Sequence, residues 1–112
     1  MLIPEEIIQQ QVIAYNARDL EAFIALHSST AQLFNLPTGE LICEGEAALR
    51  ERYSKRFESE NLHAEIVNRI VHGKRVIDHE RITGMQADRV VEAVAIYEIE
   101  NEQIQRVWFI FE

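Results

Sequence analysis

The second half of the chain, residues 62–112, is dominated by β-branched and aromatic side chains and is interrupted only by short polar breaks. These breaks fall at Gly73, at Gly84–Asp88 and at Glu100–Gln103. They separate strands expected at 62–72, 75–83, 89–99 and 104–111. Val, Ile, Tyr, Phe and Trp favour strands, and connections this short join antiparallel neighbours. The sequence therefore predicts an antiparallel meander.

Two of these strands, Val90–Tyr97 and Val107–Phe111, are apolar on both faces. A strand with one solvated face alternates between apolar and polar residues, so both faces of this sheet are expected to be covered. Helices can cover one face, and a second copy of the chain is the economical cover for the other. We therefore expect a homodimer through the outer sheet face, with an interface formed by Val94, Ile96, Trp108 and Ile110.

The first half of the chain is helical apart from one short hairpin. Pro4 suits the first turn of a helix, and Asp19 is a good N-cap for a second helix ending near His27. Ser28, Ser29 and Thr30 are expected to end that helix. Short strands at 31–36 and 41–43 flank the turn at 37–39, and a third helix spans 46–57. The fold class predicted is α+β, with three N-terminal helices packed on a curved, mostly antiparallel sheet.

Composition limits the possible partners. A chain of 112 residues forms one domain, 1–112, and its net charge of -8 argues against nucleic acid and anionic membranes. No apolar run approaches the ~20 residues of a membrane helix, and residues 1–10 do not resemble a signal peptide. The single cysteine, Cys43, favours a reducing compartment, so we expect a cytoplasmic protein.

Gln11 is out of place in the first helix. Ile7, Gln11 and Tyr15 follow one another at i, i+4 and i+8, so Gln11 lies beside the apolar stripe. One interpretation is a boundary glutamine half in solvent, which is the commoner case. The other is a hydrogen-bonding group that points into a cavity.

Four separated segments resemble a known family. They are Tyr15–Leu20 followed by Phe23 and Leu26, Gly45–Glu51, Val76–Glu80, and Ile104–Trp108. In this order they resemble the nuclear transport factor two superfamily, and within it the SnoaL-like polyketide cyclases and ketosteroid isomerase. The resemblance covers nearly the whole chain and implies the cystatin-like α+β cone. It implies less about activity, because one scaffold hosts enzymes, binders and transport adaptors.

The resemblance also permits a test of the isomerase mechanism, which needs a carboxylate base and two oxyanion donors, and which is a worked example of tuned pKa values. It places the base on Asn35, the oxyanion tyrosine on Gln11 and the acid donor on Ala95. All three roles are lost, and only the supporting tyrosine matches, as Tyr53. The resemblance implies that Gln11, Asn35 and Tyr53 face one cavity as neutral hydrogen-bonding groups.

The remaining candidate chemistry lies in Asp78-His79-Glu80. On a strand, Asp78 and Glu80 face one way and His79 faces the other. If Glu80 pairs with Glu92, His79 shares the cavity face and becomes the one group there that could act as a base near neutral pH. The alternative is a histidine hydrogen-bonded to a neighbour at the sheet surface. The sequence indicates no metal site and no cofactor.

The leading hypothesis is a homodimeric SnoaL-like protein that binds a small hydrophobic molecule. The enzyme alternative is a lyase, isomerase or hydratase with His79 as catalytic base, and a third is an interaction module that uses its sheet face. Whether the protein is an enzyme stays open at this point. The expected ligand-binding residues are Gln11, Tyr15, Phe34, Asn35, Tyr53, Phe57, His79, Tyr97 and Phe109.

Overall fold

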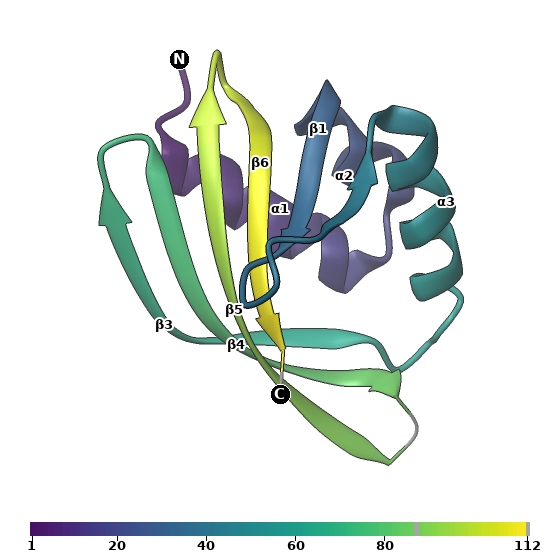
Figure 1. The fold of residues 1–112 in the computed structure, drawn as a ribbon. Helices are drawn as coiled ribbons and strands as arrows, with labels where there is room; N and C mark the ends of the chain where they lie inside the picture. The colour runs from purple at the N-terminus through teal and green to yellow at the C-terminus, as the bar shows by residue number, and fades with distance from the viewer. Residues whose placement is uncertain (87, 112) are drawn as a thin grey trace.

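The computed structural model describes residues 1–86 and 88–111 and shows three helices on one face of a single sheet (Figure 1). The helices are α1 (Pro4–Ala17), α2 (Leu20–Ala25) and α3 (Glu46–Arg56). The strands are β1 (His27–Asn35), β2 (Leu41–Glu44), β3 (His63–His72), β4 (Arg75–Gln86), β5 (Arg89–Glu100) and β6 (Gln103–Phe111). The six-stranded sheet has the order β2-β1-β6-β5-β4-β3. The predicted α+β class is confirmed.

The sheet is mixed. β1 lies parallel to β6, and the other four pairings are antiparallel. The helices are also not all N-terminal to the strands, since α3 follows β1 and β2. The expectation that Ser28, Ser29 and Thr30 end a helix was wrong. α2 stops at Ala25 and these residues already belong to β1, which begins beside Ile104 of β6.

α1 is attached to the sheet through Asn16. Its side chain donates to the carbonyl of Ala64 at 3.0 Å and accepts from the amide of Ala64 at 2.7 Å. The other side of this part of β3 pairs with β4, where Ala64 faces Ile82. The Asn16 side chain thus makes the two hydrogen bonds with Ala64 that a neighbouring strand would otherwise make at this free edge of the sheet. Asp19 then caps α2, as predicted, by accepting from the amide of Ala22.

β4 is longer than predicted because it continues through Gly84 to Gln86. Gly84 has a positive φ of 78°, and a Cβ at this position would lie 2.3 Å from the carbonyl oxygen of Asn61. The glycine is therefore required by a close approach of the chain between α3 and β3, and it does not end the strand. The loop predicted at 84–88 includes residue 87, which lies outside the described residues.

The register of β4 and β5 decides which side chains face the helices. Glu80 lies opposite Ala93, and His79 lies opposite Val94. Ala93, Ala95 and Tyr97 are buried against the helices, so Asp78 and Glu80 share the inner face and His79 is on the outer face. Within residues 1–86 and 88–111, no helix has the length and apolar character needed to cross a membrane.

Candidate functional site

A small cavity lies between α1, α3 and the inner face of the sheet. Its unfilled volume is about 10 Å³, which accommodates about one water molecule. Several polar side chains border this space although the surrounding core is apolar. The main lining residues are Gln11 and Tyr15 of α1, Tyr53 and Arg56 of α3, and Glu80, Tyr97 and Phe109 of the sheet.

Glu80 is the acidic group of the cavity. Its side chain is on β4, and only 7% of the residue is exposed. Burial raises the pKa of this carboxyl to about 7, and the charge of Asp78 raises it further, while Arg56 and Arg69 act in the opposite direction. Within the described residues, no cation forms an ion pair with it. Glu80 can therefore hold or release a proton near neutral pH.

Asp78, one step along the same face, is in a different environment. It is fully buried, and Arg69 of β3 holds both of its carboxylate oxygens, at 2.6 and 2.8 Å. Arg69 also donates to Gln9 of α1 at 3.1 Å. A bidentate pair of this kind neutralises the charge of Asp78. Of the two inward-facing carboxylates, Glu80 alone remains available for ligand chemistry.

The Tyr15 hydroxyl is buried at this cavity beside the Arg56 guanidinium, and it makes no hydrogen bond of normal length and angle with the described residues. Burial raises its pKa above the ordinary value for tyrosine, and the nearby charge of Arg56 opposes this shift. The ring is fixed by edge contacts with Phe57 at 5.5 Å and Tyr53 at 6.4 Å. Buried polar groups are rarely left unpaired, so this hydroxyl indicates a place for a water molecule or a ligand.

Arg56 borders both the cavity and a second, open space on the other side of its side chain. It lines the cavity, and it also lines an open cleft of about 630 Å³ between α3, β2 and the end of β4. Its guanidinium carbon lies 5.1 Å from the centre of the Tyr53 ring, at cation–π distance. The flexible side chain of Arg56 thus forms part of the wall between the cavity and the cleft.

Five of the residues predicted from the sequence line the cavity, namely Gln11, Tyr15, Tyr53, Tyr97 and Phe109. Gln11 is 7% exposed and lines the cavity. Its position agrees with the interpretation that its side chain points into a cavity, and not with that of a glutamine half in solvent.

Three other predicted residues lie elsewhere. Phe57 is packed into the aromatic core against Tyr15 and Phe23. Phe34 stacks on Trp108 at the outer face, with ring centres 5.8 Å apart. Asn35 accepts a hydrogen bond from the amide of Thr38, which fixes its side chain in the turn between β1 and β2.

The expectation that His79 faces the cavity was wrong. Its Nε2 lies 2.5 Å from an oxygen of Glu92 at the outer face, where both border a groove of about 340 Å³ with Val94 and Ile110. The assumed pairing of Glu80 with Glu92 differs by one residue from the observed pairing with Ala93. Because side chains alternate along a strand, a shift of one residue moves every side chain to the opposite face.

Two functional candidates, Glu80 and Arg56, were missed by the sequence reasoning. The signal for Glu80 was present in the alternation of Asp78-His79-Glu80, which places the carboxylates together and apart from the histidine. Arg56 shares a helix face with Arg50, Glu51 and Lys55, and a charged face of this kind is typical of solvent exposure. Its position one residue before Phe57 brings it to the edge of the cavity, and sequence periodicity alone does not distinguish an edge from a solvated face.

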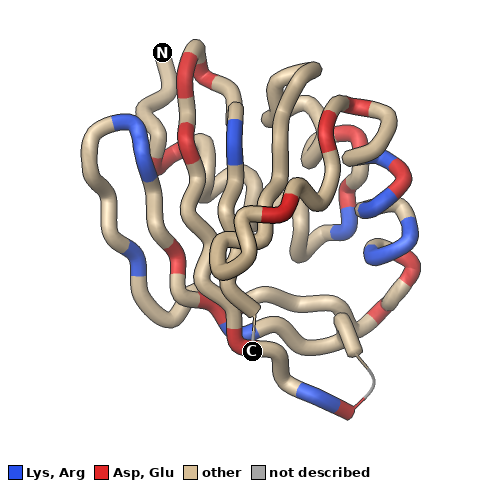
Figure 2. The backbone as a smooth tube through the Cα atoms, in the orientation of Figure 1, with Lys and Arg blue, Asp and Glu red and all other residues tan. Residues whose placement is uncertain are grey.

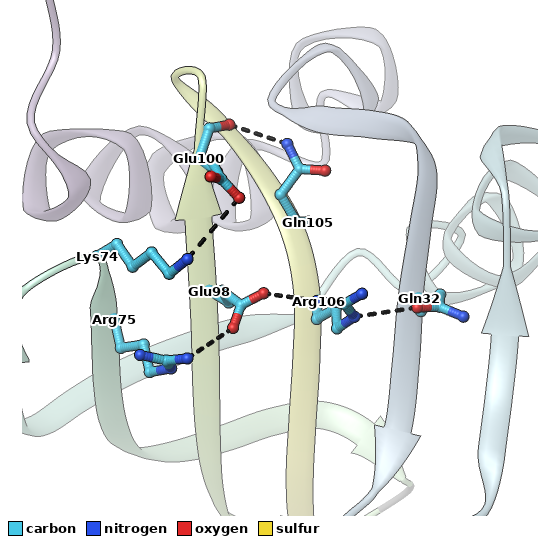
Figure 3. Close-up of polar contacts among 7 residues, drawn as sticks. All are labelled: Gln32, Lys74, Arg75, Glu98, Glu100, Gln105 and Arg106. Atoms are coloured by element: carbon cyan, nitrogen blue, oxygen red, sulfur yellow. Dashed lines mark hydrogen bonds and ion pairs between the residues drawn. The ribbon is translucent and has the colours of Figure 1, made fainter.

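The outer face of the sheet has an apolar centre between polar rows. Val94, Ile96, Trp108 and Ile110 are partly exposed there, and Ile96 lies opposite Trp108. At one end, a polar row crosses four strands (Figure 3). Glu98 is bound by Arg75 at 3.0 Å and Arg106 at 2.8 Å, and Arg106 also donates to Gln32. At the other end are the contacts of Glu92 with His79 and Arg81.

Comparison with protein families identifies the domain. Residues 8–107 match the model of the SnoaL-like domain. This chain belongs to the SnoaL-like family. No curated protein matches the sequence of this SnoaL-like chain.

Solved structures agree with the family. A cystatin-fold protein from Novosphingobium aromaticivorans is 26% identical, with a TM-score of 0.88 over 98% of this chain and 99% of that protein. A proposed ketosteroid isomerase from Kribbella flavida is 16% identical, with a TM-score of 0.84 over 97% and 77% of the two chains. A proposed polyketide cyclase from Sinorhizobium meliloti is 16% identical, with a TM-score of 0.80 over 94% of each chain. The two matches at 16% identity show a shared fold.

Proposed function

We propose that this SnoaL-like protein binds a small, largely apolar molecule in the cavity between the helices and the sheet. The observation that carries the proposal is the convergence of buried polar groups on one unfilled space, where the Tyr15 hydroxyl lies beside Arg56 and makes no hydrogen bond of normal geometry with the described residues. Gln11 and the tyrosines orient a ligand, and the aromatic walls contact its apolar body. We place this function in the cytoplasm, where the Cys43 thiol stays reduced.

Ligand entry requires side-chain movement, because about 10 Å³ is too small for an organic molecule. Arg56 is the best candidate for this movement, since it is unbranched and flexible up to its guanidinium and borders the open cleft. A ligand that displaces Arg56 towards the cleft gains access to Tyr15, Tyr53 and Glu80.

The test uses neutral probes of one scaffold, 4-phenylbutanol and 4-phenylbutanamide, titrated by NMR into the wild type and two variants. Gln11→Leu removes the amide at nearly constant volume and should weaken 4-phenylbutanamide binding about fivefold, the value of one hydrogen bond. Gln10→Leu, the matched change at an exposed position of the same helix, should leave binding unchanged. Absence of binding at millimolar probe, or shifts confined to the outer face, would reject the cavity proposal.

A second candidate function is proton transfer catalysed by Glu80, and the raised pKa of this carboxyl inside the cavity favours it. Glu80 would accept the α-proton of a bound ketone and return a proton to the enolate, with Tyr53 or Tyr97 donating to the oxygen. Wild type should then accelerate deuterium exchange into 4-phenyl-2-butanone in D2O. Glu80→Gln should fall to the buffer rate and Glu92→Gln should match the wild type. A wild-type rate equal to buffer rejects this activity.

We also propose that the protein is a homodimer joined through the outer sheet face. The partly exposed apolar centre around Trp108, Ile96 and Ile110, flanked by the polar rows of Glu98 and Glu92, has the core-and-rim arrangement of an interface. A two-fold contact places the same centre against itself and covers both patches together.

A further inference from the structure

The cleft beside Arg56 carries positive charge in an acidic protein. The chain has a net charge of -8, yet four basic residues, Arg50, Arg52, Lys55 and Arg56, lie on α3 beside the acidic Glu46 and Glu51 (Figure 2). Two of these four basic residues are neutralised by nearby carboxylates. Arg50 pairs with Glu21 and lies near Glu46, and Lys55 pairs with Glu51 at 3.5 Å. The other two, Arg52 and Arg56, line the cleft and have no ion-pair partner among residues 1–86 and 88–111.

Arg52 is incompletely satisfied. Its Nε is buried and lacks a hydrogen-bond partner in the described part of the chain. Its guanidinium lies 5.8 Å from the centre of the Tyr53 ring, and Arg56 lies 5.1 Å from the same centre. Both guanidinium groups are therefore held near one aromatic ring, at the junction of the cleft and the cavity. A guanidinium without an ion-pair partner keeps N–H donors free for a ligand. Because these donors lie in one plane, they match the two oxygens of a carboxylate.

The remaining walls of the cleft are partly apolar and partly polar, since Glu51 and Lys55, which pair with each other, and Gln86 also line it. Ile42 and Cys43 of β2, Ala48 of α3 and Met85 of β4 line it together with the arginines. An inorganic anion would use the arginines and leave these walls in water. A molecule with an acid group and an apolar body satisfies both parts of the site.

We propose that the ligand is a small amphipathic carboxylate, whose acid group is bound by Arg52 and Arg56 and whose apolar body extends along the cleft into the cavity. This inference rests on the proposed binding function and names its ligand class. The carboxylate draws the Arg56 side chain towards Arg52 and the cleft, and the same movement removes Arg56 from the cavity wall. Binding of the acid group and opening of the cavity are then one event.

The experiment compares 4-phenylbutyrate with 4-phenylbutanamide by isothermal titration calorimetry at pH 7.5 and 0.15 M salt. The two probes share one apolar body, and only the first is charged. Wild type should bind the carboxylate at least tenfold more tightly than the amide. Arg52→Gln should lose this preference, and Arg52→Lys should retain part of it. Circular dichroism and thermal melting verify that each variant is folded.

Lys55→Gln is the matched control, since it removes one positive charge from the same cleft, where Lys55 is already paired with Glu51. Carboxylate affinity in this variant should stay within about threefold of the wild type. Equal losses in Arg52→Gln and Lys55→Gln would show unspecific attraction and overturn the inference.

The outcomes separate the two proposals. Equal binding of amide and carboxylate overturns the carboxylate inference and leaves the cavity function intact. Carboxylate binding that depends on Arg52 but gives no NMR shifts at the cavity residues would reject the cavity and place the whole ligand in the cleft, against the inference as stated. Displacement of 4-phenylbutyrate by equimolar inorganic phosphate overturns the apolar part of the inference. No binding of either probe overturns both proposals.

Discussion

At the scale of single residues, Glu80 links the stability of the fold to the chemistry of the cavity. The folded protein retains the Glu80 proton up to about pH 7, whereas the ordinary pKa of the carboxyl is 4.5. Between pH 4.5 and pH 7 the carboxyl is ionised in the unfolded chain but still protonated in the folded protein, so a rise in pH favours the unfolded chain. This difference lowers the free energy of unfolding by up to roughly 3 kcal/mol as the pH rises from 4.5 to 7. Glu80 thus costs stability at neutral pH, which fits the functional role proposed for it.

Glu80→Gln should remove this cost. Relative to wild type, the variant should gain free energy of unfolding between pH 4.5 and pH 7.5, measured by urea denaturation across that range. Glu92→Gln is the control, because Glu92 is a carboxylate at the outer face whose pKa is lowered by Arg81 and His79. It should show no such gain. Parallel pH profiles for wild type and Glu80→Gln would mean that Glu80 is ionised normally in the folded state.

His27 acts in the opposite direction over an overlapping range. Burial lowers its pKa to about 4, while a hydrogen bond to the carbonyl of Phe23 opposes the shift. The unfolded chain holds the His27 proton up to its ordinary pKa of 6.5, so this residue makes stability rise as the pH increases from 4 to 6.5. In the wild type, the rise of stability with pH that His27 causes and the fall that Glu80 causes offset each other. Stability of Glu80→Gln should accordingly rise with pH over this interval.

At the scale of the elements, Asn16 joins the end of α1 to the free edge of β3. Asn16→Ala removes both hydrogen bonds to Ala64 and leaves its amide and carbonyl without their partner. We expect a loss of about 2 kcal/mol in the free energy of unfolding and faster hydrogen exchange at the Ala64 amide. Asn61→Ala, at an exposed position, should change stability by less than about 0.5 kcal/mol. Unchanged exchange at Ala64 would contradict the role assigned to Asn16.

At the scale of the whole molecule, we expect the outer sheet face to determine the oligomeric state. Trp108 stacks on Phe34 and lies opposite Ile96, at the centre of the partly exposed apolar patch. Its neighbours in that patch include Val94 and Ile110. Burial of several hundred Å² of this surface, at roughly 25 cal/mol per Å², would hold two copies together. Large aromatic side chains dominate such contacts, so Trp108 is the expected anchor.

Trp108→Glu should therefore give a monomer or an insoluble chain, as measured by light scattering at micromolar concentration. The control is Gln105→Glu, which adds the same charge near the start of β6, away from the apolar patch, and should leave the protein dimeric. A monomeric wild-type protein would show that this face is stable in water and that the dimer proposal is wrong.

Local sequence patterns determined the elements of this protein and its family. The β-branched runs after residue 62 specified the long strands, and Asp19 specified the start of α2, because both signals act over a few neighbouring residues. The helical spacing of Ile7, Gln11 and Tyr15 likewise brought Gln11 to the cavity. The parallel contact of β1 with β6 had no local signal, since its partners are more than 70 residues apart.

The tertiary structure alone decided which chemistry faces the cavity. Alternation along β4 grouped Asp78 with Glu80 and separated them from His79, but it did not say which group is inside. That depends on register, and a shift of one residue between β4 and β5 exchanges the two faces. Arg69 compensates Asp78, while Glu80 has no such partner within the described chain, and these long-range contacts set their different roles. Burial and distant charges, which no local pattern contains, make Glu80 the titratable group of the site.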